Sequence, residues 1–197
     1  MTLYLVRHTK VNSPTGVCYG QSDIDVHSTF ETEKSILISK LQKINFDKIY
    51  SSPLKRCTIL AEAFINSHNK VSYDQRLVEL NFGKWEGKIW SEIEKSEEAK
   101  LWFNDYMNTP CPGGESYIDL LTRVQDFLYD LKNKDFENKV LIICHGGTIR
   151  AFHTIIKKVS LQESFDLKID YGQIVKMELN NSYINNYQCE SRVKILS

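Results

Sequence analysis

Five side chains in this sequence have the chemistry needed to handle a phosphate group: Arg7, His8, Arg56, Glu79 and His145. An arginine guanidinium is a planar fork of N–H donors that matches two phosphate oxygens at once. A neutral histidine can attack phosphorus and hold the phosphoryl group covalently, so that one hard displacement becomes two easier ones. A second histidine can stabilise charge on the phosphoryl oxygens, and a carboxylic acid can protonate the leaving alcohol. These residue types predict phosphoryl transfer, provided that the fold brings them together.

Each of these residues also has an ordinary structural explanation when it is taken alone. An Arg–His pair after a strand is usually a surface or capping pair. His145 is followed by Gly146 and Gly147, which a strand-to-helix turn could require for its backbone. Glu79 could be a solvated loop carboxylate, which is the commoner fate of glutamate. The hypothesis of a shared site therefore depends on where the chain places these residues.

The hydrophobic pattern places three of the candidate positions at the ends of predicted strands. Residues 3–6 are a short apolar run that leads into Arg7 and His8, and residues 47–52 form a second strand shortly before Arg56. Residues 140–144 form the clearest buried strand and end at His145. Ligands of open α/β sheets bind beyond the carboxyl ends of the strands. We therefore expect the three strand ends to converge on one site.

The remaining periodicities complete the predicted fold. Amphipathic helices are expected over 30–43, 54–68, 117–131 and 148–158, and further strands over 71–73 and 173–179, with another from Tyr183 onwards. Alternating strands and helices indicate an α/β fold. We expect a three-layer α/β/α sandwich, with a mostly parallel central sheet and helices on both faces.

The length and composition predict how this fold is organised as a domain. A chain of 197 residues, 42% hydrophobic and 25% charged, suits a single domain spanning residues 1–197. Residues 9–28 form a long loop, and loops of this length are more often functional than idle. The aromatic-rich segment of about residues 84–116 is expected to be a helical excursion over the active site, as a lid or a pocket wall.

Charge and cysteine content exclude several classes of partner. The 25 basic and 25 acidic residues give a formal net charge of zero, which argues against a nucleic-acid-binding surface. The apolar runs are too short to span a membrane, and the N-terminus lacks a signal-peptide pattern. The five cysteines show no zinc-ligand spacing, which predicts reduced thiols in a cytoplasmic protein without a metal site. The oligomeric state is left open, with a homodimer among the alternatives.

Four blocks of sequence, in the family's order, resemble the histidine phosphatase superfamily, also called the phosphoglycerate mutase-like family. Residues 5–9 (LVRHT), followed by Asn12, resemble the signature that contains the Arg-His pair. Residues 51–62 resemble the block with the second phosphate-binding arginine, and residues 77–87 the block with the general acid. Residues 140–150 match the block with the second catalytic histidine. The resemblance covers residues 3–155 and is specific.

This resemblance implies a role for each candidate residue. His8 would be the phosphorylated nucleophile, and Arg7, Arg56 and His145 would clamp the phosphoryl oxygens. Glu79 would donate a proton to the leaving group and then act as a base. Substrate binding is implied for six positions: Arg7, Asn12, Gln21, Ser22, Arg56 and Gly146. No metal or cofactor is implied, and the implied partner is a small-molecule phosphate ester.

Finer features of the sequence indicate a branch of the family. Residues 83–87 (GKWEG) and the short chain are typical of phosphatases, since the related mutases carry an insertion that covers the site. Residues 18–21 (CYGQ) and 112–116 (PGGES) resemble the α-ribazole phosphatase group. The expected function is a phosphomonoesterase that uses a phosphohistidine, with α-ribazole 5′-phosphate, a precursor of the cobalamin lower ligand, as the favoured ester. A broad-specificity sugar-phosphate phosphatase, a phosphoglycerate mutase and a non-catalytic phospho-ligand binder are the alternatives.

Overall fold

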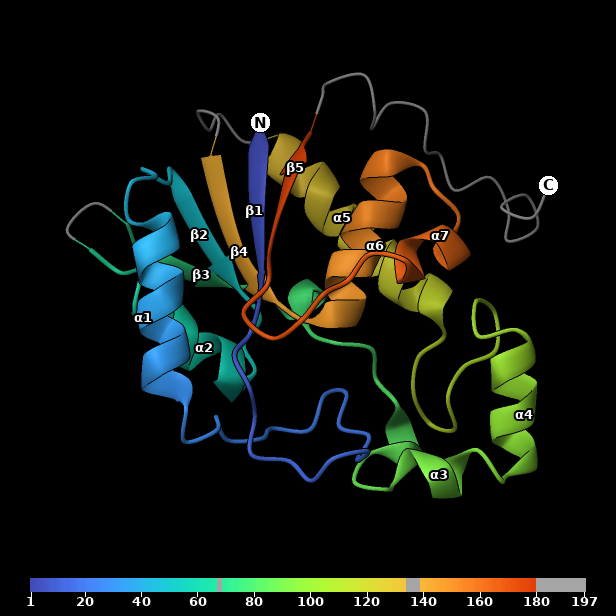
Figure 1. Ribbon diagram of the computed structural model, residues 1–197. Helices are drawn as coiled ribbons and strands as arrows, with labels where there is room; N and C mark the ends of the chain where they lie inside the picture. The colour runs from blue at the N-terminus through green and yellow to red at the C-terminus, as the bar shows by residue number, and fades with distance from the viewer. Residues whose placement is uncertain (67–68, 134–138, 180–197) are drawn as a thin grey trace.

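A mostly parallel sheet lies at the centre of the computed structural model, which describes residues 1–66, 69–133 and 139–179 (Figure 1). Its five described strands are β1 (Thr2–Arg7), β2 (Lys48–Ser51), β3 (Val71–Tyr73), β4 (Lys139–Cys144) and β5 (Ile174–Glu178). The strands lie in the order β3-β2-β4-β1-β5, and every pairing is parallel except that of β1 with β5. The strand expected from Tyr183 lies outside the described residues.

Helices cover both faces of the sheet, as predicted (Figure 1). On one face lie α1 (Phe30–Leu41) and α2 (Lys55–Glu62), and on the other lie α5 (Tyr117–Lys132) and α6 (Gly146–Lys157). In β4, Leu141 and Ile143 belong to the core under α1 and α2, whereas Val140 and Ile142 belong to the core under α5 and α6. Successive strand residues point to opposite faces, so a strand buried on both sides must be apolar throughout. The predicted three-layer α/β/α sandwich is confirmed.

Two helix boundaries differ from the prediction. Helix α2 ends at Glu62 instead of reaching residue 68, because the chain tightens into i→i+3 bonds, with the Phe64 amide donating to the Ala61 carbonyl. Helix α6 begins at Gly146, two residues earlier than expected, with His145 in the extended N-cap position. By contrast, α5 begins where the sequence predicts, because Ser116 and Asp119 form a reciprocal capping box.

The segment from residue 82 to 117 lies beyond the main sheet and carries an aromatic cluster of its own. It contains a 3-10 helix at Gly83–Trp85, α3 (Trp90–Ile93) and α4 (Glu97–Asn104). The Trp102 ring lies 5.6 Å from the Trp85 ring and 5.7 Å from the Tyr106 ring. Tyr106 in turn lies 5.7 Å from Phe165, the last residue of α7 (Leu161–Phe165). The aromatic residues of this segment therefore link it to a helix that follows α6, while its role as a lid and the division into domains stay predictions.

In the described part of the chain, none of the helices has the length and apolar character that crossing a membrane requires.

Candidate active site

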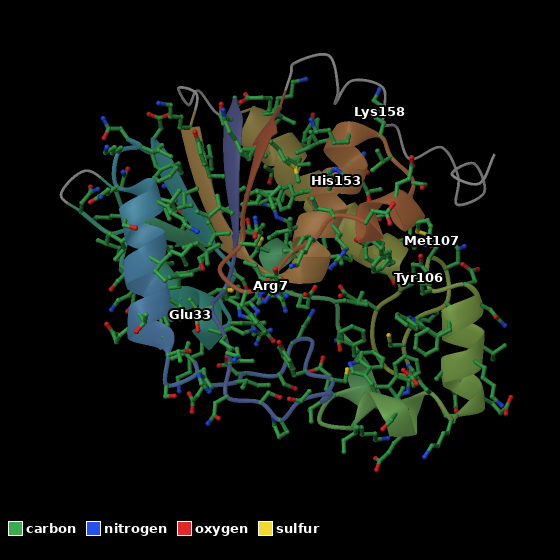
Figure 2. All side chains as sticks on the ribbon, in the orientation of Figure 1. Arg7, Glu33, Tyr106, Met107, His153 and Lys158 are labelled. Atoms are coloured by element: carbon green, nitrogen blue, oxygen red, sulfur yellow. The ribbon has the colours of Figure 1, made fainter. Side chains whose placement is uncertain are left out.

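The carboxyl ends of β2, β4 and β1 are neighbours in the sheet, and they bring the predicted histidines together. His8 follows β1 and His145 follows β4, and their ring centroids are 5.1 Å apart. The Nε2 atom of His145 lies 2.8 Å from the hydroxyl of Ser52, which follows β2. Figure 2 shows Arg7 at this same end of the sheet. The expected convergence of three strand ends is therefore observed.

The environment of His8 makes it a neutral imidazole with one free nitrogen. Its side chain is 2% exposed, and Nδ1 lies 2.8 Å from the Thr9 carbonyl oxygen. Because a carbonyl only accepts hydrogen bonds, Nδ1 carries the hydrogen and Nε2 keeps its lone pair. Burial, followed by the nearby charge of Arg56, holds the pKa of His8 well below its usual value. Such a histidine is a competent nucleophile at neutral pH.

His145 is buried and held from one side. Burial lowers its pKa well below the ordinary value, and the charge of Arg56 lowers it further. The Ser52 hydroxyl can donate to Nε2 of the neutral ring, which leaves the hydrogen on Nδ1 available for another acceptor. The Cys57 sulfur lies 3.6 Å from the same Nε2. Burial raises the pKa of this thiol to about 12, so Cys57 packs beside the histidine as an uncharged group.

Arg56, which is buried, and Arg7, which is half-buried, lie beside His8 without a carboxylate partner among the described residues. Arg56 has no exposed surface, and its Nη1 and Nη2 donate to the carbonyls of Ser22 (2.8 Å) and Gly20 (2.7 Å). Arg7 donates through Nη1 to the Ile169 carbonyl at 2.7 Å. Within the described residues the Nε atoms of both arginines are buried without a partner, and neither arginine forms an ion pair. An uncompensated buried cation is costly, so this arrangement favours binding of an anion.

Two tyrosine rings lie next to these arginines. The Arg7 Cζ atom lies 4.0 Å from the centre of the Tyr171 ring, and the Arg56 Cζ atom lies 5.4 Å from the centre of the Tyr19 ring. The two tyrosine hydroxyls are joined by a hydrogen bond of 2.6 Å. Each arginine therefore has an aromatic neighbour, and the neighbours are tied together. The sequence singled out the CYGQ segment that contains Tyr19, but it gave no signal for Tyr171.

Glu79 is fixed by backbone amides at the start of α6. Its Oε2 accepts a hydrogen bond from the Gly147 amide (2.9 Å), and its Oε1 accepts one from the Leu80 amide (3.0 Å). A Cβ atom on Gly147 would lie only 2.3 Å from Glu79 Oε1. The second glycine after His145 therefore leaves open the space that this carboxylate occupies, and a larger residue there would require the carboxylate to shift.

The backbone around Glu79 is held by an ion pair that the sequence analysis did not identify. Arg123 of α5 donates to the carbonyl oxygens of Val78 (2.7 Å) and Glu79 (2.9 Å). The Arg123 Nε donates to Glu115 at 2.9 Å, and Glu115 accepts a further bond from the Asn81 amide. Glu115 lies in the PGGES segment, so its block carried a signal, whereas Arg123 lies within an ordinary amphipathic helix.

Three of the predicted substrate-binding residues lie in the loop after β1. The amides of Gln21 and Ser22 donate to Glu86 at 2.8 Å and 2.6 Å, and the Gln21 side chain donates to the Glu79 carbonyl. The Asn12 amide donates to the Asp25 carbonyl, and the residue is exposed. Phosphate binding by these three residues stays a prediction. To bind phosphate, the amides of Gln21 and Ser22 must give up their hydrogen bonds to Glu86.

Gly146, the fourth predicted binding residue of this kind, lies between two guanidinium groups. A Cβ atom on Gly146 would lie 3.5 Å from the Nη1 atom of Arg150 and 3.7 Å from the Cζ atom of Arg7. The start of α6 is therefore next to Arg7, one of the two arginines beside His8. A phosphate contact through this part of the backbone also stays a prediction.

A cavity of about 220 Å³ adjoins the site at Arg7 and Glu79. It is lined by Arg7, Glu79, Leu80, Phe82, Trp102, Tyr106, Tyr117, Gly146, Gly147, Arg150 and Phe165. Arg7 and Glu79 mark the end of the cavity that adjoins the phosphate-handling residues, and the rest of the wall is mainly aromatic. Figure 2 shows Tyr106 on the side of α4. No cluster of three or more His, Cys, Asp or Glu residues that could hold a metal occurs among the described residues.

Comparisons with known proteins relate the whole chain to one family. The family model of the histidine phosphatase superfamily (branch 1) matches residues 3–187. The chain is 30% identical over 199 residues to a candidate phosphoserine phosphatase of Hydrogenobacter thermophilus. This alignment covers 96% of this chain and 97% of that protein. It is also 30% identical over 183 residues to a 2,3-bisphosphoglycerate-dependent phosphoglycerate mutase of Rhizobium etli, with 85% of each chain covered. The crystal structure of the α-ribazole phosphatase from Shigella flexneri has a TM-score of 0.84, 21% identity and 92% coverage of both chains, a likeness in fold.

Proposed function

We propose, from the premise that this chain belongs to the histidine phosphatase superfamily and is a phosphoric monoester hydrolase, that it acts through a phosphohistidine on His8. One observation carries the proposal. A neutral, buried His8 with a free Nε2 lies beside the buried guanidinium of Arg56 and the half-buried guanidinium of Arg7, and neither has a carboxylate partner in the described chain. This combination suits a nucleophile directed at a phosphate dianion.

The proposed reaction has two displacement steps. In the first, His8 Nε2 attacks phosphorus, the bond from phosphorus to the ester oxygen breaks, and Glu79 gives its proton to the leaving alkoxide. In the second, a water molecule attacks the phosphohistidine, Glu79 takes a proton from that water, and the N–P bond breaks to release inorganic phosphate. Arg7, Arg56 and His145 stabilise the charge on the phosphoryl oxygens in both steps.

The ester favoured by the sequence is α-ribazole 5′-phosphate. The CYGQ segment supports it, and so does the aromatic wall of the cavity, which could hold a flat base against Phe82 and Trp102. O-Phosphoserine is a second candidate. The 30% identical phosphoserine phosphatase relative supports it, and so does the guanidinium of Arg150 in the same wall.

The phosphohistidine can be tested by trapping it. The enzyme is mixed with p-nitrophenyl phosphate, quenched rapidly in base and analysed by intact-protein and peptide mass spectrometry. We expect one base-stable, acid-labile phosphoryl group on the peptide that contains His8. The His8→Ala variant should lack this group, whereas the matched variant His27→Ala, which changes a histidine outside the site, should retain it. A phosphoryl group on another residue, or wild-type turnover by His8→Ala, would overturn the proposal.

The ester is tested separately by comparing kcat/KM across a panel. The panel contains α-ribazole 5′-phosphate, O-phosphoserine, 3-phosphoglycerate, sugar phosphates and nucleotides. A clear preference for α-ribazole 5′-phosphate would support the sequence-based candidate. Mutase activity toward 3-phosphoglycerate, stimulated by 2,3-bisphosphoglycerate, would instead identify a mutase.

A further inference from the structure

Arg150 is a half-buried cation in the cavity wall that forms no hydrogen bond or ion pair with the described residues. It lies in the second turn of α6, and its side chain lines the cavity that adjoins the site at Arg7 and Glu79. Its Nε atom is buried without a hydrogen-bond partner, and no described carboxylate forms an ion pair with it. The mechanism proposed above makes no use of this residue. The structure therefore contains a third arginine that lacks an assigned role.

The surroundings of Arg150 strengthen its preference for an anion. Its Cζ atom lies 5.1 Å from the centre of the Phe165 ring, and the neighbouring wall is formed by Tyr106, Tyr117 and Trp102. Burial lowers the pKa of Arg150, although a guanidinium remains a cation in proteins. An aromatic wall supplies few hydrogen-bond acceptors, so the N–H groups that face the cavity remain available to a ligand.

The position of Arg150 relates it to the leaving group of the ester. Arg150, Arg7 and Gly146 line the same cavity. A Cβ atom on Gly146 would lie 3.5 Å from the Nη1 atom of Arg150 and 3.7 Å from the Cζ atom of Arg7. Arg7 belongs with His8, and Glu79 must face the ester oxygen to protonate it. A monoester with its phosphoryl group at His8 and its ester oxygen at Glu79 therefore directs its next few atoms along the wall that holds Arg150.

We propose, on the basis of the function proposed above, that Arg150 binds a carboxylate on the leaving group, so that the natural substrate is a phosphate monoester of a hydroxy acid such as serine. A carboxylate matches the planar fork of one arginine through two parallel N–H···O bonds. A second phosphate would require more donors, and Arg7, the other cation that the described residues place in the wall, is used by the phosphoryl group. A ribosylated base offers only neutral acceptors to Arg150, and these form weaker hydrogen bonds with a guanidinium than a carboxylate does.

Matched substrate pairs isolate the carboxylate. O-Phosphoserine and phosphoethanolamine differ by one carboxylate, and 3-phosphoglycerate differs from glycerol 3-phosphate by a carboxylate in place of a hydroxymethyl group. We expect the wild-type enzyme to have a higher kcat/KM for the carboxylate member of each pair. We expect Arg150→Met to reduce kcat/KM for the carboxylate members by about 10- to 100-fold more than for their partners, because the variant loses a charged bidentate pair with the carboxylate.

Two further variants guard against a trivial loss of structure. Arg150→Lys keeps the charge but not the fork, so its preference for the carboxylate members should fall between those of the wild type and Arg150→Met. Lys157→Gln removes an exposed cation from the same helix and should leave kcat/KM unchanged for both substrates of each pair.

The outcomes separate this inference from the function on which it rests. Equal losses by Arg150→Met on both members of each pair would make Arg150 a phosphoryl ligand and overturn the inference. A wild-type preference for α-ribazole 5′-phosphate that survives Arg150→Met would overturn it as well. In either case p-nitrophenyl phosphate would still trap a phosphoryl group on His8. Failure of that trapping in the wild type would refute the proposed function instead.

Discussion

The two ends of the candidate site are built from different parts of the molecule. The phosphate end consists of His8, His145 and Arg7 on adjacent strand ends, with Arg56 on the helix after β2, and every one of these elements belongs to the main sandwich. The leaving-group end is a cavity whose wall comes from the 82–117 segment, α6 and α7. One end is dense in charge, whereas the other is mainly aromatic with the single cation of Arg150.

This difference separates chemistry from specificity. The phosphate end is fixed by strand register, because the pairing of Arg7 with Cys144 sets His8 beside His145. The leaving-group end depends on packing between loops and short helices, such as the contact of Tyr106 with Phe165. Substitutions at the first end should therefore affect all esters alike, and those at the second should depend on the alcohol.

The largest effect should follow from loss of the nucleophile. We expect His8→Ala to lower kcat by on the order of 10⁴-fold for every ester, because all of them share the same displacement at phosphorus. Steady-state assays with p-nitrophenyl phosphate, O-phosphoserine and α-ribazole 5′-phosphate provide the measurement. If the loss differed strongly between esters, the proposed separation between the two ends would break down.

A smaller, ester-dependent effect is expected at Glu79. Glu79→Gln should slow hydrolysis of alkyl esters by about 100-fold or more, because an alkoxide cannot leave without a proton. The kcat/KM of the p-nitrophenyl ester, which does not include the second step, should fall much less, because its phenolate is stable in water. Gly147→Ala should show the same selectivity, because its Cβ would displace the Glu79 carboxylate. Equal losses of kcat/KM on alkyl and aryl esters would remove Glu79 from the role of acid.

Glu86 joins the two ends, and its removal should cost stability. Its carboxylate accepts bonds from the amides of Gln21, Ser22 and Phe82, which places one residue between the phosphate-end loop and the cavity wall. We expect Glu86→Ala to lower the free energy of unfolding in urea by about 2–4 kcal/mol. Glu97→Ala removes an exposed ion pair with Lys100 and should cost less than about 1 kcal/mol. Similar losses for the two variants would show that Glu86 does not hold the ends together.

The last prediction concerns the pH dependence of stability. His8 and His145 resist protonation in the folded state, whereas unfolded histidine takes up a proton near its ordinary pKa of about 6.5. The unfolded state therefore binds more protons, so stability is fully present above about pH 6.5 and falls as the pH decreases, by up to about 1.4 kcal/mol per pH unit for each histidine. Urea titrations between about pH 6.5 and 5 should show this slope, and a His8→Gln/His145→Gln double variant should flatten it. An unchanged slope in the double variant would mean that other groups carry the effect.

The sequence was most informative where local pattern alone determines position. The apolar run 140–144 can only be a buried strand, and the residue after such a strand lies at the ligand-binding edge, so His145 could be placed from the pattern. The end of α2 could not, because Ala63, Phe64 and Ile65 continue the apolar composition while the backbone turns. Composition does not record the i→i+3 bonds that end a helix.

The supporting residues of the site were not predictable for a different reason. Arg123 acts on the carbonyl oxygens of Val78 and Glu79, and backbone oxygens carry no sequence signal. Tyr171 reaches Tyr19 and Arg7 from the turn before β5, far away along the chain. Contacts of this kind exist only after the sandwich has formed, and a single sequence does not report them.

The clearance at Gly147 also bears on how this protein can change over evolutionary time. A side chain there would occupy the space of the Glu79 carboxylate, so a mutation away from glycine requires that carboxylate to move. A lineage can accept such a mutation if its acid is placed differently or is no longer needed. Among relatives, a side chain at this second glycine should therefore accompany a changed position of the acid, or its loss.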